Sequence, residues 1–192
     1  MRRVDKQDVD RAVAEMVRVL EPYDAQDWAV PAGSLEWSCW ATAAHVAHDL
    51  LAYAGQVAAR PSDAYLPFDL VVHPGGSPRE VLQVVTACGG LLSSALATAG
   101  PETRAWHWGA CDPAGFAAMG VAEVLLHTFD ITQGLGVSWL PPAPLCEVVL
   151  SRLFPDAPPG DPAQVLLWCT GRGELDGRAR RTSWVWEAAV SN

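Results

Sequence analysis

The chain has 192 residues, of which half are hydrophobic and 18% are charged, with a formal net charge of −9. This composition belongs to a globular protein with a sizeable core and excludes an intrinsically disordered chain. The acidic balance, with no basic cluster beyond Arg178, Arg180 and Arg181, also excludes nucleic acid as an expected partner.

Two features of the sequence bear on its location. The first ten residues are charged and lack the apolar core of a signal peptide. No apolar run approaches the roughly 20 residues that span a bilayer. We therefore expect a cytoplasmic protein with no membrane partner.

Helical periodicity predicts two helices in the first third of the chain. Apolar residues at helical spacing predict a helix over residues 4–22, followed by a loop over 23–36. Two tryptophans, Trp28 and Trp37, are expected to anchor this loop on the core. A second helix is predicted over 38–59.

This second helix carries a group of polar side chains. At about 100° per residue, His45, Asp49 and Gln56 share one face, while His48 lies about 60° away. Two interpretations remain open. The face is solvated with His45 at its edge, or His45 belongs to a ligand site completed by another helix.

Residues 60–76 are rich in proline and glycine and predict a loop, with His73 exposed to solvent. A third helix is predicted over 78–99. Ser77 and Glu80 form the sequence pattern of a capping box at its start. Because this segment is nearly uncharged after Glu80, we expect it to be central.

The segment 112–136 is the longest predicted helix, with Asp112 suited to cap its N-terminus. Glu123, His127 and Asp130 fall within a stripe roughly 60° wide on this helix. Three ionisable groups on an otherwise apolar helix are costly to bury unless something binds them. A divalent metal is the simplest such ligand.

The rest of the chain gives weaker signals. The Trp-His-Trp sequence at 106–108 lines a pocket mouth or packs as a loop. Short helices are predicted over 145–154 and 162–170, and the alternation over 178–187 predicts an edge strand with its tryptophans on one face. Taken together, the elements predict an all-α four-helix bundle over residues 1–140 and a small C-terminal α/β extension over 141–192.

The ligand types match those of a metal site. Glu123 and His127 lie one helical turn apart, so both can bind one ion. His45 from a facing helix would complete a set of two histidines and one glutamate, which is known for catalytic zinc with an open coordination position. Asp130 would orient an imidazole from outside the ligand set, or is a surface carboxylate at the helix end.

Five scattered cysteines with no C-x-x-C pattern are typical of reduced thiols. Cys111 differs from the others because it precedes a predicted helix N-terminus, where a thiolate would be stabilised. The alternative for each cysteine is a small buried hydrophobic side chain.

Three segments resemble a known family. They are W-S-C-W-A-T-A-A-H-V-A-H-D-L-L-A-Y-A-G-Q (37–56), G-V-A-E-V-L-L-H-T-F-D-I-T-Q-G-L-G (120–136) and L-L-W-C-T-G-R-G-E-L-D-G-R (166–178). In this order they are similar to the mycothiol-dependent maleylpyruvate isomerase family of the DinB-like superfamily, over roughly residues 5–187. The resemblance implies a DinB-like four-helix bundle that holds a metal ion through His45, Glu123 and His127.

The resemblance also implies an activity. Mycothiol would bind at the metal, most readily zinc, with nickel or manganese as alternatives, and its thiolate would attack a small electrophilic substrate in a transfer or isomerisation. His48 or Asp130 would carry protons. Arg172 would meet an anionic group of the thiol or the substrate, or is a surface arginine after a helix.

A biased composition fits this reading. The chain has one Lys, one Ile and one Asn against twelve Arg, which indicates a GC-rich genome such as that of an actinomycete, and mycothiol is the actinomycete thiol. Two other functions remain open: a metal-dependent hydrolase on the same site, and a stress protein that binds metal or ligand without turnover. The sequence leaves the electrophile open, as it does the choice between monomer and homodimer.

Overall fold

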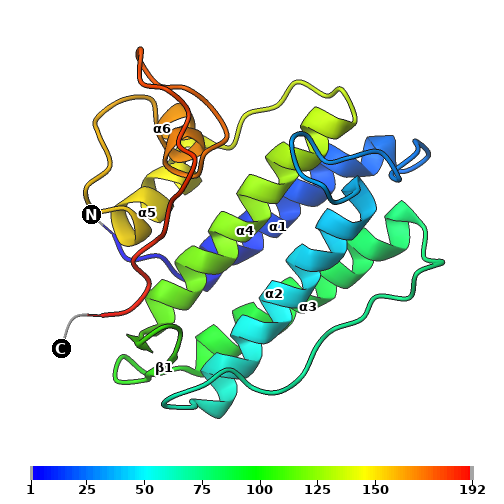
Figure 1. Ribbon diagram of the computed structural model, residues 1–192. Coiled ribbons are helices and arrows are strands. Elements are labelled where there is room, and N and C mark those ends of the chain that lie inside the picture. Colours follow the sequence, from blue (N-terminus) through cyan, green and yellow to red (C-terminus); the bar gives the residue numbers. More distant parts are fainter. Residues whose placement is uncertain (1, 191–192) are drawn as a thin grey trace.

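Four long helices form the body of the molecule in the computed structural model, which describes residues 2–190 (Figure 1). They are α1 (Lys6–Leu20), α2 (Cys39–Ala59), α3 (Pro78–Thr98) and α4 (Pro113–Gly134). Helix α2 packs against α3 and α4, and α1 packs against α3 and α4 from the other side. The predicted all-α bundle is confirmed.

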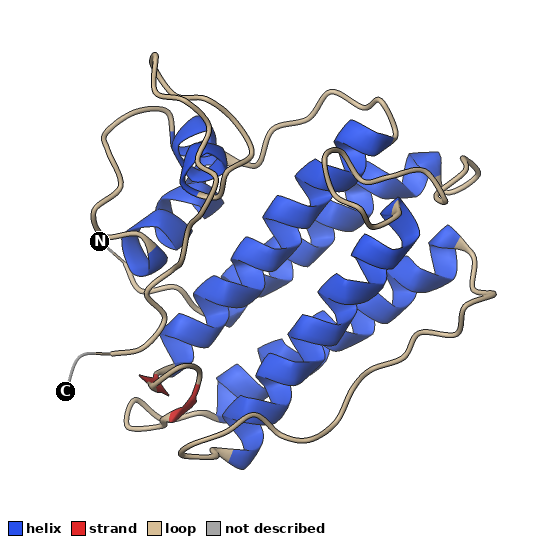
Figure 2. Ribbon diagram, in the orientation of Figure 1, coloured by secondary structure: helices blue, strands red, loops and turns tan. Residues whose placement is uncertain are grey.

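Smaller elements complete the fold. A 3₁₀ turn, η1 (Glu21–Tyr23), follows α1, and strands β1 (Ala105–Trp106) and β2 (Ala110–Cys111) form a short antiparallel hairpin before α4. Helices α5 (Ala143–Leu153) and α6 (Pro162–Cys169) follow, with α5 packed against α4 and α6 against α5. Within the described residues this hairpin is the only sheet (Figure 2). We keep the division near residue 140 as a proposal.

Side-chain caps explain where the long helices begin. Ser38 accepts a hydrogen bond from the Ala41 backbone N–H (3.1 Å), and Asp112 accepts one from the Gly115 N–H (2.8 Å). The capping box expected at Ser77 is present. Each cap satisfies a backbone donor that the helix itself leaves unpaired. All six predicted helices are confirmed, each with both ends within two residues of the expected bounds.

The edge strand predicted over 178–187 is wrong. After α6 the chain runs as an irregular tail that joins the body at single points: the Glu187 N–H donates to Leu153 O, and the Val190 N–H donates to Ala110 O. Arg152 donates to the carbonyls of Glu187 and Ala188. The alternating tryptophans therefore reflect one-sided burial without a strand partner.

Helix α4 is the core helix of the bundle. By length and hydropathy alone, α3 and α4 qualify as candidate membrane spans. This finding corrects the expectation that no apolar segment is long enough to cross a bilayer. In α4, however, 94% of the apolar window is buried inside the protein, against 44% in α3. A buried core helix passes the same test, and its central position accounts for the apolar character of α4.

Gly134 fixes the loop before α2 against the end of α4. A Cβ at this position would collide with the carbonyl oxygen of Pro31 and lie 2.7 Å from Cys39 Sγ. We expect Gly134→Ala to lower the free energy of unfolding by about 1–3 kcal/mol, because backbone atoms must move. Gly90, inside α3, is the control position. A Cβ there would have no neighbouring atom within 4 Å, so Gly90→Ala should raise the free energy of unfolding by about 0.5–1 kcal/mol. Urea denaturation of both variants measures this, and equal shifts would contradict it.

Candidate metal centre

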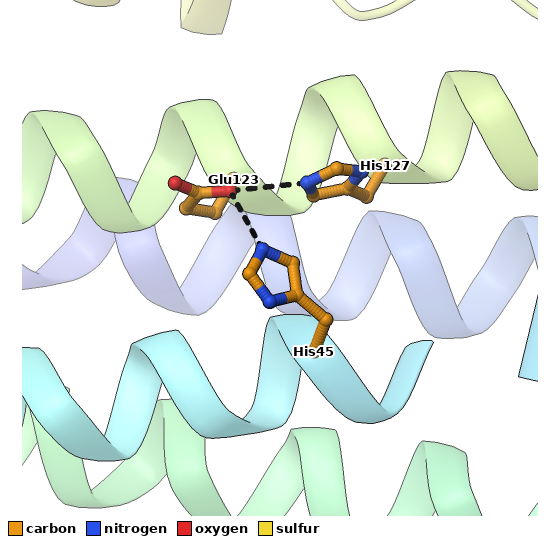
Figure 3. A group of neighbouring side chains, drawn as sticks. All are labelled: His45, Glu123 and His127. Atoms are coloured by element: carbon orange, nitrogen blue, oxygen red, sulfur yellow. Dashed lines mark ion pairs between the residues drawn. The ribbon is translucent and has the colours of Figure 1, made fainter. Parts of the chain in front are cut away.

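Helices α2 and α4 bring three donor groups together. Glu123 and His127 lie one turn apart on α4, and His45 faces them from α2 (Figure 3). Glu123 Oε2 lies 3.2 Å from His127 Nε2 and 4.0 Å from His45 Nε2. The ligand atoms of all three lie within 4.8 Å of one another. The structure thus places the three predicted metal-binding residues side by side.

The donor set fits a divalent ion. Ligand atoms on a tetrahedral zinc ion lie about 3.3 Å apart, which follows from metal–ligand bonds of about 2.0–2.1 Å. The observed spacings require only a small inward movement of His45. His45 has a side chain that is 30% exposed, against 11% for Glu123 and 10% for His127, so one side of the group remains open. An open side is where a water or a substrate would bind.

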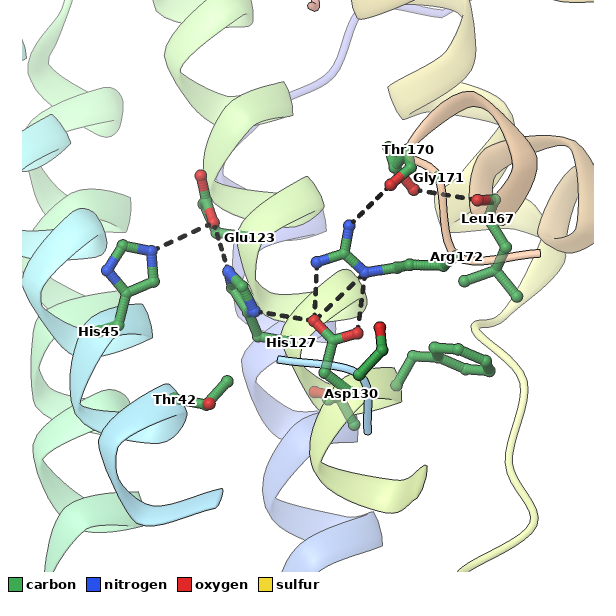
Figure 4. Close-up of polar contacts among 12 residues, drawn as sticks. Thr42, His45, Glu123, His127, Asp130, Leu167, Thr170, Gly171 and Arg172 are labelled. Carbon is green, nitrogen blue, oxygen red and sulfur yellow. Dashed lines mark hydrogen bonds and ion pairs between the residues drawn. The ribbon is translucent and has the colours of Figure 1, made fainter. Parts of the chain in front are cut away.

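A chain of hydrogen bonds holds His127 at Nδ1, the ring nitrogen that points away from the other two donors (Figure 4). His127 Nδ1 lies 3.0 Å from Asp130 Oδ2, and Arg172 donates to the two Asp130 oxygens at 2.7–3.2 Å. Arg172 also donates to the Thr170 carbonyl. A carboxylate on one imidazole nitrogen leaves the other, Nε2, free to bind a metal, as in many histidine sites.

Protonation of the histidines follows from their surroundings. Burial lowers the pKa of His45, and the nearby charge of His127 lowers it further, so His45 is in the neutral form that a metal requires. Burial alone would lower the pKa of His127, but its hydrogen bonds to Asp130 and Glu123 raise that pKa to about 9. In the metal-free protein His127 therefore carries a proton between the two carboxylates.

Two further residues contact the group that sequence reasoning did not assign to it. Asp49 Oδ2 lies 3.2 Å from His45 Nε2, and the Tyr53 hydroxyl donates to Glu123 Oε1 at 3.3 Å. Burial and then the charge of Glu123 raise the pKa of Asp49 to about 8. The spacing of four residues between His45 and Asp49 is the signal for Asp49 in the sequence, and this spacing is equally consistent with a solvated helix face.

His48 lies apart from the three donors. Its Nδ1 accepts a hydrogen bond from the Leu70 backbone N–H at 3.2 Å. It lines a second cavity of about 310 Å³, together with Asp49, Tyr53 and His107. The structure brings His45, and not His48, onto the α4 pair.

The donors open into the main cavity, of about 800 Å³. Its walls come from α2 and the loop before it, the β1–β2 hairpin, α4 and the tail after α6. The lining residues are Leu35, Trp37, His45, His107, Trp108, Glu123, Leu126, His127, Arg172 and residues 184–189.

Aromatic residues of the loop before α2 and of the β1–β2 hairpin line this cavity. Trp28 is buried in the core as expected, but Trp37 is 48% exposed and lies against His45 with ring centroids 4.7 Å apart and the ring planes tilted by 59°. The expectation that Trp37 anchors on the core is therefore wrong. Of the Trp-His-Trp sequence, His107 is buried in the cavity wall and Trp108 is 79% exposed at its edge. The pocket-mouth interpretation of that sequence fits better than a packed loop.

Cys111 is not activated by its position before a helix. It is fully buried, and burial raises the pKa of its thiol to about 12. The neighbouring carboxylate of Asp112 opposes ionisation as well. All five cysteines are buried and unpaired, so the interpretation as small buried side chains fits them all.

Comparison with known proteins identifies the family of the chain. A family model described as the mycothiol maleylpyruvate isomerase N-terminal domain matches residues 9–132, more than half of the chain, including all three donors. Searches of the curated proteins and of the solved structures found no match. The chain therefore belongs to the mycothiol maleylpyruvate isomerase N-terminal domain family.

Proposed function

We propose that this protein is a metal-dependent enzyme that uses mycothiol to transfer a thiol to, or isomerise, a small electrophilic substrate in the cytoplasm. The observation that carries the proposal is the group of His45, Glu123 and His127 at the wall of a cavity of about 800 Å³. Membership of the family supports mycothiol as the thiol. Zinc is the metal that best suits two imidazoles and one carboxylate with an open position.

When bound, the ion supplies a Lewis acid that favours the thiolate form of mycothiol over the thiol. The chain's own residues then have separate tasks. Asp130 holds Nδ1 of His127 so that Nε2 points at the donor group. Arg172 fixes Asp130 in turn; its guanidinium is turned toward that carboxylate, so binding an anionic group of the thiol is at most a second role for it. His48 lines the second cavity and is not among the residues that line the main one, so the geometry does not support the proton-transfer role expected for it.

The covalent step needs no nucleophile from the protein, because the thiolate of mycothiol attacks the substrate. The thiolate sulfur forms a bond to the electrophilic carbon, and a leaving group such as bromide departs with the bonding pair. For an activated double bond the sulfur adds to one carbon, and the electron pair of the double bond moves to the neighbouring carbon, which takes up a proton from solvent. Rotation about the resulting single bond, followed by loss of that proton and departure of the thiolate, gives isomerisation. No cysteine of the chain takes part, because each is buried with a pKa above the ordinary thiol value.

The test is conjugation of mycothiol to monobromobimane, followed by fluorescence. We expect a rate well above the uncatalysed one, lost on treatment with a chelator and restored by zinc. Cys111→Ala should keep this activity and Glu123→Ala should lose it. Turnover that disappears in Cys111→Ala but survives in Glu123→Ala would show that a protein thiol does the chemistry.

A further inference from the structure

The main cavity is walled by indole rings. Trp37, Trp108, Trp184 and Trp186, four of the nine tryptophans of the chain, line it from three different segments. Trp184 and Trp186 lie against each other with ring centroids 5.6 Å apart. Aromatic walls with few polar groups favour flat apolar ligands, since they bury large areas at little conformational cost.

The charge of the lining disfavours an anionic substrate. Among the described residues that line this cavity, Arg172 is the only arginine or lysine. Its side chain is 11% exposed, and its guanidinium is directed at Asp130 and the Thr170 carbonyl. His127, which carries a proton in the metal-free protein, lies between the carboxylates of Glu123 and Asp130. The lining itself contains two carboxylates, Glu123 and Glu187. Cationic partners free to meet a carboxylate would favour a dicarboxylate, but the two cations of the lining, Arg172 and His127, are already paired with carboxylates of the protein.

Trp108 adds an independent observation. It sits in the hairpin turn at a φ of 53°, a left-handed conformation that a bulky residue rarely adopts, and is followed by Gly109 at a φ of 143°. This conformation holds an indole that is 79% exposed at the edge of the cavity, 5.4 Å from the Trp106 ring. Residues held in such sparsely populated backbone conformations cluster at active sites and ligand-binding sites.

We propose that the main cavity binds an uncharged, flat aromatic electrophile, of the quinone or nitroarene class, and discriminates against dicarboxylates. The aromatic part would lie between Trp108 and the Trp184–Trp186 pair, with its reactive carbon toward the donor group. The cavity volume is that of a site for a small organic molecule, about 300–1,000 Å³. That the ligand is an electrophile rests on the proposed function, whereas that it is apolar and aromatic rests on the residues lining the cavity alone.

Calorimetric titration of the full chain tests this choice. The chain is first freed of metal, so that a carboxylate cannot bind through an ion, and is titrated with 2-naphthol and separately with maleate. Neither probe reacts with thiols by displacement, and neither requires mycothiol. We expect saturable binding of 2-naphthol, at least about tenfold tighter than that of maleate.

Substitutions locate the binding. Trp186→Ala should weaken 2-naphthol binding about tenfold or more, while Trp139→Ala, outside the cavity lining, should leave it unchanged. If Trp186→Ala fails to fold, Trp108→Ala decides, because an indole that is 79% exposed contributes little to the core. Maleate binding as tight as that of 2-naphthol, or 2-naphthol binding that survives in the Trp108 and Trp186 variants, would overturn the proposal. Since binding uses neither thiol nor metal, its failure is distinct from a failure of conjugation.

Discussion

His127→Ala is expected to reduce the metal content of the purified protein from near-stoichiometric to background, whereas His73→Ala leaves it unchanged. His127 supplies one of three donor atoms that lie within 4.8 Å of one another, and an open site with three protein ligands tolerates the loss of none. His73 lies in an exposed loop outside that group. Elemental analysis of protein purified without an affinity tag measures the difference.

The same measurement on α2 decides between its two histidines. His45→Ala should lose metal, and His48→Ala should retain it, because only His45 lies near Glu123. Circular dichroism before and after heating shows whether each variant keeps its fold. Equal metal content in the His127 and His73 variants would refute the site, and metal lost only in His48→Ala would reverse the assignment on α2.

Asp130→Asn is expected to have two large effects, although Asp130 touches no metal. An amide cannot hold His127 Nδ1–H as a carboxylate does, so metal affinity should fall about 10- to 100-fold. Arg172, whose side chain is 11% exposed, would lose its anionic partner, and breaking a buried pair from one side costs about 3–5 kcal/mol of stability. Competition with a chromogenic chelator and urea denaturation measure the two effects.

A second variant separates these two effects. Arg172→Met removes the cation but leaves the hydrogen bond between Asp130 and His127. It should lower stability while changing metal affinity less than Asp130→Asn does. Metal affinity that is equal to that of the unsubstituted protein in Asp130→Asn would show that Asp130 is only a structural partner of Arg172.

The bundle could be predicted because its signals are local. Ser38, Ser77 and Asp112 cap helices through contacts within three residues of each cap, and such contacts are visible in a sequence. The pair of Glu123 and His127 is local in the same way, since four residues on a helix fix one face. His45 lies on a different helix, so its place in the donor group could not be predicted from local spacing alone. The family resemblance supported that assignment.

What could not be predicted depends on contacts between distant segments. Asp130 pairs with Arg172 across 42 residues, and no local pattern distinguishes that contact from a surface position. Cys111 was expected near a favourable helix N-terminus, but burial raises the pKa of its thiol to about 12 and outweighs that effect. The alternation of apolar and polar residues over 178–187 predicts a strand, but the structure has none there. Such alternation indicates only which side of the chain is buried.

The central claim is that mycothiol binds as a thiolate at the ion held by His45, Glu123 and His127. Substituting cobalt for the native metal and adding mycothiol tests it directly, because a cobalt–thiolate bond produces a ligand-to-metal charge-transfer band in the near ultraviolet. We predict that this band appears on addition of mycothiol, saturates, and is absent in His127→Ala. Conjugation of mycothiol by the cobalt protein without any such band would contradict the claim.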